Sequence, residues 1–286
     1  MFKQRVLTAL LLAPLALAAV FFLPLSGFAV FVAVAFLLAA YEWASFCGWQ
    51  SLVAKLGYVA ITGLGFVGCY LALPEQLHWP IQTNLFADTL LYVGIGWWLV
   101  AVLLIVSFNQ SKEFWQHNTL LKAVMGFTTL LPSFGAILLL RNVDYVQSPY
   151  TGAWLIFSLL GLVWAADVGG YVIGKPFGKR KLMPAVSPGK TLEGLFGGML
   201  FVLLLVTAIA AYREFPQDMW LWYGAAVLLT LLSVFGDLSE SMFKRVAGLK
   251  DSGSIIPGHG GIMDRIDSLT ATAPLFALFV ALFGGY

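Results

Sequence analysis

The sequence predicts an all-α, polytopic integral membrane protein with about nine transmembrane helices and a cytoplasmic N-terminus. Of its 286 residues, 60% are hydrophobic and only 10% carry a charge, and the mean hydropathy is +0.88. This composition excludes an ordinary soluble domain. No segment shows the alternating pattern of an outer-membrane strand, so helices must satisfy the backbone polar groups inside the bilayer.

Nine stretches are long and apolar enough to cross a bilayer, because a spanning helix needs about 20 mainly apolar residues. In chain order they cover residues 6–23, 27–46, 53–73, 86–107, 119–140, 151–174, 193–212, 219–243 and 266–284. We expect residues 1–150 to form an N-terminal transmembrane bundle and residues 151–286 a C-terminal catalytic transmembrane region. Most connections are short, and the two longest carry many charges, at 175–192 and 244–265.

The basic residues support this order of spans. Only Arg141 and Arg213, of the 16 Lys and Arg residues, would lie on the outer side of the membrane. Basic residues concentrate in cytoplasmic loops, and one span more or fewer would reverse every later loop. We therefore expect the loops 175–192 and 244–265 to face the cytoplasm.

Two features of the first spans need separate interpretation. The first segment is similar to a signal peptide, with basic residues before an apolar stretch that ends in alanines. A second apolar span follows almost at once, which favours a retained helical hairpin over cleavage. Cys47 and Cys69 are expected near opposite ends of neighbouring spans, so we expect packing residues and not a disulfide.

The eighth span carries a polar stripe near its inner end. Asp237, Ser241 and Lys244 lie at positions i, i+4 and i+7, which places them near one helical face. Glu240 and Arg245 flank this face. A carboxylate within a span normally faces a cavity. The alternative is a helix end from which Lys244 and Arg245 simply reach the interface.

Asp264 and Asp267 open the ninth span three residues apart, so both carboxylates can point the same way. Either one alone would be an ordinary partner of the helix dipole. Together with Asp237 they provide three hard oxygen donors, which predicts a magnesium site beside a polyphosphate. We do not expect His259 to bind the metal, because hard ions avoid imidazole and no cysteine or second histidine is nearby.

Glycine is frequent in the turn that precedes this span. Gly260 and Gly261 allow backbone N–H groups to approach an anion closely, and His259 could donate to a phosphate. A purely structural turn is the alternative. A second candidate is Asp167, which lies inside a span beside two glycines and could face the same cavity.

The loop 175–192 contains the sequence SPGKT, with Ser187, Lys190 and Thr191, and is similar to the end of a P-loop. A P-loop is excluded, because Pro184 stands where its first glycine should be and no strand precedes it. The five basic residues of this loop nonetheless fit a nucleoside triphosphate or an anionic headgroup. For Lys175, Lys179 and Lys181 an ordinary positive-inside loop is the alternative.

The run from Ser241 to Asp267, SMFKRVAGLKDSGSIIPGHGGIMDRID, resembles the signature of the phosphatidate cytidylyltransferases, also called CDP-diacylglycerol synthases. The matching residues are Ser241, Lys244, Arg245, Lys250, Asp251, Gly253, Pro257, His259, Gly260, Gly261, Asp264, Arg265 and Asp267. The stretch DVGGYVIGKPFGKRKLMPAVSPGKTLEG is similar to a second block of that family. The first five spans resemble the family only in hydropathy and length.

This resemblance implies a reaction in which phosphatidate attacks the α-phosphorus of CTP, giving CDP-diacylglycerol and pyrophosphate for phospholipid biosynthesis. It implies magnesium dependence, with a second cation such as K⁺ as an open alternative. It also implies a homodimer in a bacterial inner membrane with the active site facing the cytoplasm. CTP, phosphatidate and membrane lipid are the expected partners, and nucleic acid is not.

The expected site residues fall into three sets. The catalytic set is Lys190, Lys244, Arg245, Lys250, Asp251, His259 and Arg265. The substrate-binding set is Ser187, Lys190, Thr191, Ser241, Gly260 and Gly261. The metal-binding set is Asp237, Asp264 and Asp267.

Three other classes of protein remain as alternatives. A transporter or channel could use Asp167 and Asp237 as a cation or proton path, but the polar groups gather at one end of the spans. A CDP-alcohol phosphotransferase would need a DG motif followed by AR, which is absent. A binding scaffold would not need the carboxylates together with the Gly-His-Gly-Gly turn.

Overall fold

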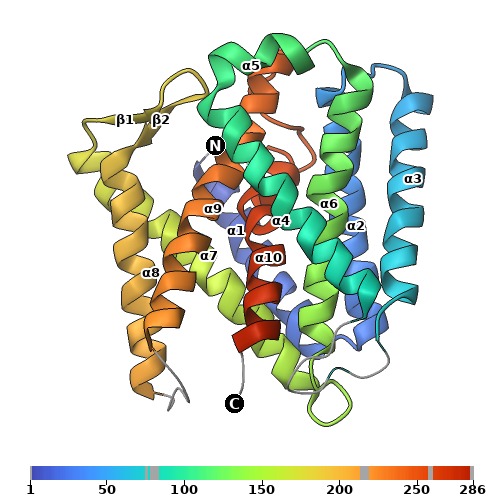
Figure 1. Cartoon of the computed structure of the whole chain (residues 1–286), viewed down its shortest axis with the longest axis vertical. Helices are drawn as coiled ribbons and strands as arrows, with labels where there is room; N and C mark the ends of the chain where they lie inside the picture. The colour runs from blue at the N-terminus through green and yellow to red at the C-terminus, as the bar shows by residue number, and fades with distance from the viewer. Residues whose placement is uncertain (1, 75–76, 78–83, 213–218, 257–259, 284–286) are drawn as a thin grey trace.

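The structure is a computed structural model that describes residues 2–74, 77, 84–212, 219–256 and 260–283. The described residues form ten helices and two short strands (Figure 1). In chain order the helices are α1 (Phe2–Phe22), α2 (Leu25–Phe46), α3 (Leu52–Leu71), α4 (Leu85–Val106), α5 (Phe108–Trp115), α6 (Thr119–Asn142), α7 (Pro149–Phe177), α8 (Leu192–Tyr212), α9 (Met219–Ala247) and α10 (Met263–Phe283). The strands, between α7 and α8, are β1 (Lys181–Met183) and β2 (Ser187–Thr191).

Polar residues cap three helices at the points where the chain enters an apolar span. Ser51 accepts a hydrogen bond from the backbone N–H of the third residue of α3, and Asn84 and Asn118 do the same for α4 and α6. Such side chains satisfy backbone donors that have no partner within the helix. The caps therefore set the starts of three helices at the boundaries between loop and span.

Eight helices among the described residues are long and apolar enough to cross a membrane, namely α2, α3, α4, α6, α7, α8, α9 and α10. The prediction of an all-α polytopic membrane protein is confirmed. The first predicted span corresponds to α1, whose described apolar stretch runs from Leu10 to Phe22. A ninth crossing by α1 stays a prediction.

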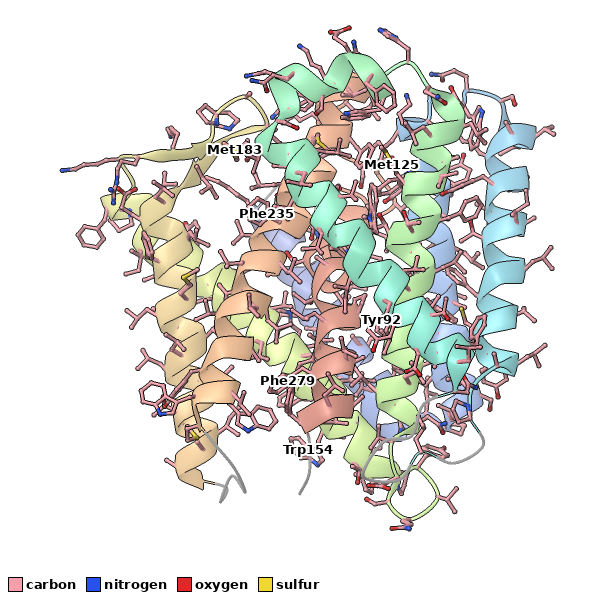
Figure 2. All side chains as sticks on the ribbon, viewed as in Figure 1. Tyr92, Met125, Trp154, Met183, Phe235 and Phe279 are labelled. Atoms are coloured by element: carbon pink, nitrogen blue, oxygen red, sulfur yellow. The ribbon has the colours of Figure 1, made fainter. Side chains whose placement is uncertain are left out.

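The helices alternate in direction, so the connections gather at two ends of the bundle. Figure 1 shows α5, the β1–β2 hairpin and the last turns of α9 together at the upper end, which we call the hairpin end. The chain turns between α2 and α3 at this end as well, where Thr119 donates a hydrogen bond to the Cys47 carbonyl. The side chains of Met183 and Trp154, labelled in Figure 2, lie towards opposite ends of the bundle.

Helix α6 is the most enclosed element of the bundle. Of its apolar window 78% is buried, compared with 22% for α3, so α6 is central and α3 peripheral. Helices α7 and α9 have 29 residues each, or about 44 Å of helix. Both are longer than the hydrocarbon core of about 30 Å. Figure 1 shows α7 crossing the bundle diagonally, which is how a long helix fits a thinner bilayer.

Glycines allow α7 and α8 to pack closely. A Cβ atom added to Gly198 of α8 would lie 2.8 Å from the Ala166 carbonyl oxygen of α7, and one added to Gly194 would lie 3.0 Å from the Gly170 oxygen. Small residues at such contacts let two helix backbones approach each other. This tight pair fixes the two ends of the segment that carries the hairpin.

Two regular elements were not predicted from the sequence, the short helix α5 and the β1–β2 hairpin. The expectation that no strand precedes the SPGKT sequence was wrong, because β1 lies directly before it. The strands of the hairpin are antiparallel, with Lys181 opposite Thr191 and Met183 opposite Ser187. Val186, in the turn, is fully buried, and its carbonyl accepts a hydrogen bond of 3.1 Å from Arg245 Nε of α9. We expected an open loop here. The hairpin is instead held by tertiary contacts with α9, which no local pattern reveals.

A buried arginine fastens the other end of the bundle. Arg141 at the end of α6 is 1% exposed and donates to the carbonyls of Pro149 and Leu23, at 2.7 and 3.1 Å. Its guanidinium also lies over the rings of Phe28 and Tyr145, at 5.7 and 5.1 Å. The positive-inside pattern predicted this basic residue on the outer side, and it does lie at the end opposite the hairpin.

Candidate active site

Lys190 and Asp237 join the two charged segments of the chain. Lys190, on β2, places Nζ 2.8 Å from Asp237 Oδ2 on α9, and the same Nζ lies 3.4 Å from the Val234 carbonyl. The two side chains are 23% and 39% exposed, so a ligand can reach both of them. A partly solvated pair of this kind can exchange partners easily, because its net interaction energy is small.

Two further carboxylates lie near this pair. Asp267 of α10 is 8% exposed and lies close enough to Asp237, Asp167 and Lys190 for their charges to act on it. Asp167 of α7 is exposed and lies in the field of Lys190, Asp237 and Arg265. We call Asp167, Asp237 and Asp267 the carboxylate cluster. Three acidic groups around one lysine create a place that favours a bound cation.

Lys244 is the centre of a second network, about two turns further along α9 than Asp237. Its Nζ lies 2.6 Å from Glu240 Oε2 and 2.6 Å from Asp264 Oδ1. The expected polar stripe is only partly formed, because Ser241 Oγ donates to Asp237 Oδ1 at 3.3 Å whereas Lys244 turns to Glu240. The i, i+4 spacing of Glu240 and Lys244 explains this choice, since such pairs are neighbours on a helix.

Asp264 organises the backbone of the loop before α10. Its Oδ2 atom accepts hydrogen bonds from Ser252 N at 3.1 Å, Ser252 Oγ at 2.8 Å and Gly261 N at 2.9 Å. Gly260, next to this contact, has a φ angle of +83°, a conformation that favours glycine. Asp264 and Asp267 therefore face different partners, although helical spacing would allow them to point the same way.

The donor set fits a hard cation, but it is not assembled into a closed metal site. Carboxylate oxygens are the ligands that magnesium prefers. Within the described residues, however, no three acidic, imidazole or thiol side chains lie in metal-binding geometry. In this structure the ammonium group of Lys190 neutralises Asp237, and the ammonium group of Lys244 neutralises Asp264. The metal set Asp237, Asp264 and Asp267 stays a prediction.

The other expected site residues lie at the same end of the bundle in different surroundings. Thr191 is buried and its hydroxyl accepts a hydrogen bond of 3.1 Å from Gly194 N in the first turn of α8. Ser187 pairs with Met183 in the hairpin. Lys250, Asp251 and Arg265 are exposed around the loop before α10. Residue His259 lies outside the described residues.

Three polar residues of this region were not among the expected site residues. Glu42 of α2 and Glu240 of α9 are each 2% exposed, and Ser252 is 4% exposed. Oε1 of Glu240 is buried without a hydrogen-bond partner in the described part of the chain. Glu42 had a visible signal in the sequence, because it is a charged residue inside an apolar span, where such residues are costly.

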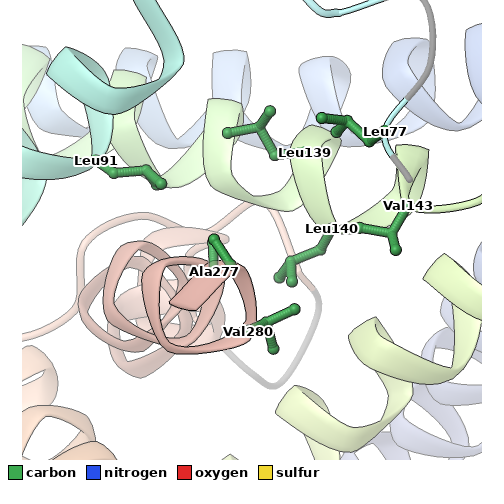
Figure 3. Close-up of a pocket in the computed structure, with 8 residues that line it drawn as sticks. Leu77, Leu91, Leu139, Leu140, Val143, Ala277 and Val280 are labelled. Atoms are coloured by element: carbon green, nitrogen blue, oxygen red, sulfur yellow. The ribbon is translucent and has the colours of Figure 1, made fainter. Parts of the chain in front are cut away.

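A small apolar pocket near the other end of the bundle is unsuited to nucleotide binding (Figure 3). Leucine, valine and alanine side chains of α4, α6 and α10 line it, together with Leu77 and Val143. Its cavity volume of about 10 Å³ is of the order needed for a single water molecule. The charged groups at the hairpin end are therefore the better candidate for chemistry.

Comparison with known proteins identifies the family. The sequence model of the cytidylyltransferase family matches residues 3–283, which is nearly the whole chain. This chain belongs to the cytidylyltransferase family. The match covers the N-terminal helices as well as the charged loops, so Glu42 and Lys190 both lie within the cytidylyltransferase sequence.

Two bacterial relatives match this cytidylyltransferase over nearly their full length. The phosphatidate cytidylyltransferase of Haemophilus influenzae is 38% identical over 289 residues, which cover 98% of each chain. The phosphatidate cytidylyltransferase of Pseudomonas aeruginosa is 39% identical over 278 residues, covering 97% of this chain and 96% of the relative. That of Staphylococcus aureus is 42% identical over 127 residues, or 44% of this chain. The family resemblance inferred from the charged motifs is confirmed.

Proposed function

We propose that the protein is a CTP:phosphatidate cytidylyltransferase that makes CDP-diacylglycerol in phospholipid biosynthesis. A phosphate oxygen of phosphatidate forms a bond to the α-phosphorus of CTP, and the bond to the departing pyrophosphate breaks. The proposal is supported by the full-length similarity to phosphatidate cytidylyltransferases. The contact between Lys190 and Asp237, from two charged segments far apart in the sequence, carries the structural side of the argument.

The reaction needs charge neutralisation and alignment more than it needs a strong base. The phosphate monoester of phosphatidate is already anionic at neutral pH, so no group has to remove a proton first. Positioned cations lower the barrier by stabilising the charge on the transferring phosphoryl group and on the leaving pyrophosphate. In our proposal Lys190, Lys244, Arg245 and Lys250 hold the triphosphate.

Lys190 and Lys244 are suited to an exchange of partners. In the structure each ammonium group rests on a carboxylate, Asp237 for Lys190 and Asp264 for Lys244. A triphosphate carries more charge than one carboxylate and would draw both lysines towards it. The carboxylates released in this way would then be free to hold a cation.

Asp237 and Asp267 would hold magnesium, and Asp264 would join them once Lys244 has turned to the triphosphate. The ion would neutralise the charge of the phosphates, which is the usual role of magnesium in phosphoryl transfer. All other steps fall to the side chains, which bind the nucleotide and keep the headgroup in line with the α-phosphorus. The carboxylate cluster, with its excess of negative charge, supports this assignment.

The depth of these groups fits a substrate that is part of the membrane. Asp237 lies ten residues before the end of α9, or about 15 Å along the helix. A headgroup can reach this depth while its acyl chains remain in lipid and CTP enters from water. We propose that the hairpin end faces the cytoplasm of a bacterial inner membrane and that the enzyme acts as a homodimer.

A direct assay tests this function. Protein purified in detergent would be incubated with radiolabelled CTP, phosphatidate and Mg²⁺, and the lipid fraction would be analysed for label. We expect labelled CDP-diacylglycerol that depends on both substrates and on the metal. A membrane preparation that moves cations but makes no labelled lipid would favour the transporter alternative.

A further inference from the structure

Glu42 is a buried carboxylate on α2, far in the sequence from the charged loops. Its side chain is 2% exposed, and none of the ion pairs among the described residues includes it. A buried carboxylate is costly unless hydrogen bonds satisfy its oxygens. The position of its donors therefore indicates what this residue does.

Among the residues that the structure describes, the hydrogen-bond donors to Glu42 all come from the loop after α9 and from the start of α10. The backbone N–H groups of Ile262 and Met263 donate to Oε1 and Oε2, at 3.0 and 2.8 Å. Ser252 Oγ lies 3.1 Å from Oε2. N–H groups at a helix start have no partner within the helix, and a negative charge there is favoured by the helix dipole. Glu42 thus caps α10 from a different helix.

The loop backbone packs directly on this carboxylate. A Cβ atom added to Gly253 or to Gly261 would collide with the carboxylate oxygens of Glu42. Glycine at these two positions is therefore required by the contact, and any side chain would push the loop away from α2. The adjacent Trp43 fixes α2 beside α9, because its ring centre lies 4.7 Å from that of Phe243.

A continuous chain of polar contacts links Glu42 to Lys244. Ser252 Oγ lies within hydrogen-bond distance of both Glu42 Oε2 and Asp264 Oδ2, at 3.1 and 2.8 Å. Asp264 Oδ1 is in turn 2.6 Å from Lys244 Nζ. Displacement of the loop would therefore move two of the residues that our mechanism assigns to metal and triphosphate.

We propose that Glu42 is a positioning residue of the active site. It holds the loop and the first turn of α10 in the arrangement that presents Asp264 and Lys244 to the triphosphate of CTP. This role rests on the proposed function. It also gives the N-terminal part of the chain an indirect share in catalysis, because Glu42 acts through Ser252 and Asp264.

The test compares conservative variants of the full-length protein in the labelled-CTP assay. Glu42→Gln replaces one acceptor oxygen with a donor that faces other donors. We expect kcat/KM for CTP to fall about tenfold or more, while KM for phosphatidate changes less than about twofold. Glu42→Asp keeps the carboxylate and should recover part of the loss. Glu113→Gln, on the exposed side of α5, is the matched control and should behave like wild type.

The possible outcomes distinguish a failure of the proposed function from a failure of the role proposed for Glu42. Wild-type protein that makes no labelled lipid would refute the proposed function and with it the role of Glu42. An active wild type with a fully active Glu42→Gln variant would refute the positioning role alone. So would equal losses for both substrates with no recovery in Glu42→Asp, since these indicate a general loss of structure. If Glu42→Gln is not recovered folded, Ser252→Ala decides, and normal CTP kinetics in that variant would overturn the inference.

Discussion

Lys190 of the hairpin and Lys179, just before it, have different surroundings, so we expect different roles for them. Lys190 points to Asp237, whereas Lys179 is exposed and contacts Glu193 only through its backbone N–H. A basic residue that serves only the positive-inside rule can be lost with little effect on turnover. A residue that holds the triphosphate cannot, so the two lysines form a natural pair for comparison.

We expect Lys190→Ala to lower kcat/KM for CTP about 10- to 100-fold, because hydrogen bonds to charged groups contribute about 1.5–3 kcal/mol. Lys179→Ala should remain near wild type. Steady-state kinetics with CTP varied at saturating phosphatidate would measure both. If Lys190→Ala changed only the dependence on phosphatidate, Lys190 would belong to the lipid headgroup instead.

The carboxylates give a second prediction at the scale of the residue. Asp237→Asn, Asp264→Asn and Asp267→Asn should each reduce turnover at least about a hundredfold, since a lost metal ligand removes several kcal/mol of transition-state stabilisation. The residual activity should need more Mg²⁺ for half-saturation. A magnesium titration of the three variants checks this, with Asp88→Asn at the start of α4 as control. Near-normal activity in all three would contradict the metal assignment.

Sequence patterns predicted the kinds of residue at the site better than their pairing. Asp237, Ser241 and Lys244 share a helical face, as spacing requires, but Lys244 pairs with Glu240 and Asp264. Helical periodicity fixes direction around an axis and cannot decide between neighbours on adjacent helices. The contact of Lys190 with Asp237 and the contacts of Glu42 with the loop before α10 both depend on tertiary packing, so no spacing in the sequence could predict them.

At the scale of the element, the boundaries of most spans followed from hydropathy because length and polarity are fixed by the bilayer. The largest differences are at the ends of α7 and α9, which run three and four residues beyond their predicted spans, and at the starts of α1 and α10, which begin four and three residues before theirs. The added residues of α7 and α9 begin at Lys175 and Lys244 and lie at the hairpin end. Hydropathy predicts only the part of a helix that contacts lipid. Backbone hydrogen bonds continue the helix beyond that part until a capping residue ends it.

The glycine contact between α7 and α8 can be tested by substitution. Gly198→Ala would place a methyl group 2.8 Å from the Ala166 carbonyl and should cost about 1–3 kcal/mol through overpacking. Gly224→Ala on α9 meets nothing within 4 Å and should be neutral or stabilising by up to about 1 kcal/mol. Thermal unfolding in detergent, followed by the loss of helical signal, compares the two variants. Equal melting temperatures would mean that the close approach of α7 and α8 contributes little to stability.

At the scale of the whole molecule, charge is strongly asymmetric along the bundle axis. The carboxylate cluster, the Lys244 network and the hairpin all lie at one end, whereas a buried Arg141 and an apolar pocket characterise the other. This asymmetry is what distinguishes an enzyme acting at one membrane surface from a transporter, whose polar path should continue across the bilayer. The topology of the chain in the membrane determines whether the hairpin end faces the cytoplasm or the outside.

Cysteine labelling in intact cells tests the topology. Cys47 and Cys69 are both buried, and burial raises the pKa of Cys47 to about 12, so native thiols should react slowly. Both would still be replaced. Single cysteines would then be introduced at the exposed positions Val146, Ala185 and Ser254.

Because basic residues concentrate on the cytoplasmic side, an impermeant thiol reagent should reach only Val146→Cys before lysis and all three positions after it. Activity of each variant in the labelled-CTP assay shows that the labelled molecules are folded. Labelling of Ser254→Cys from outside intact cells would place the candidate site away from the CTP pool. In that case the proposed reaction could not occur in the cell at this site, and the transporter alternative would have to be tested next.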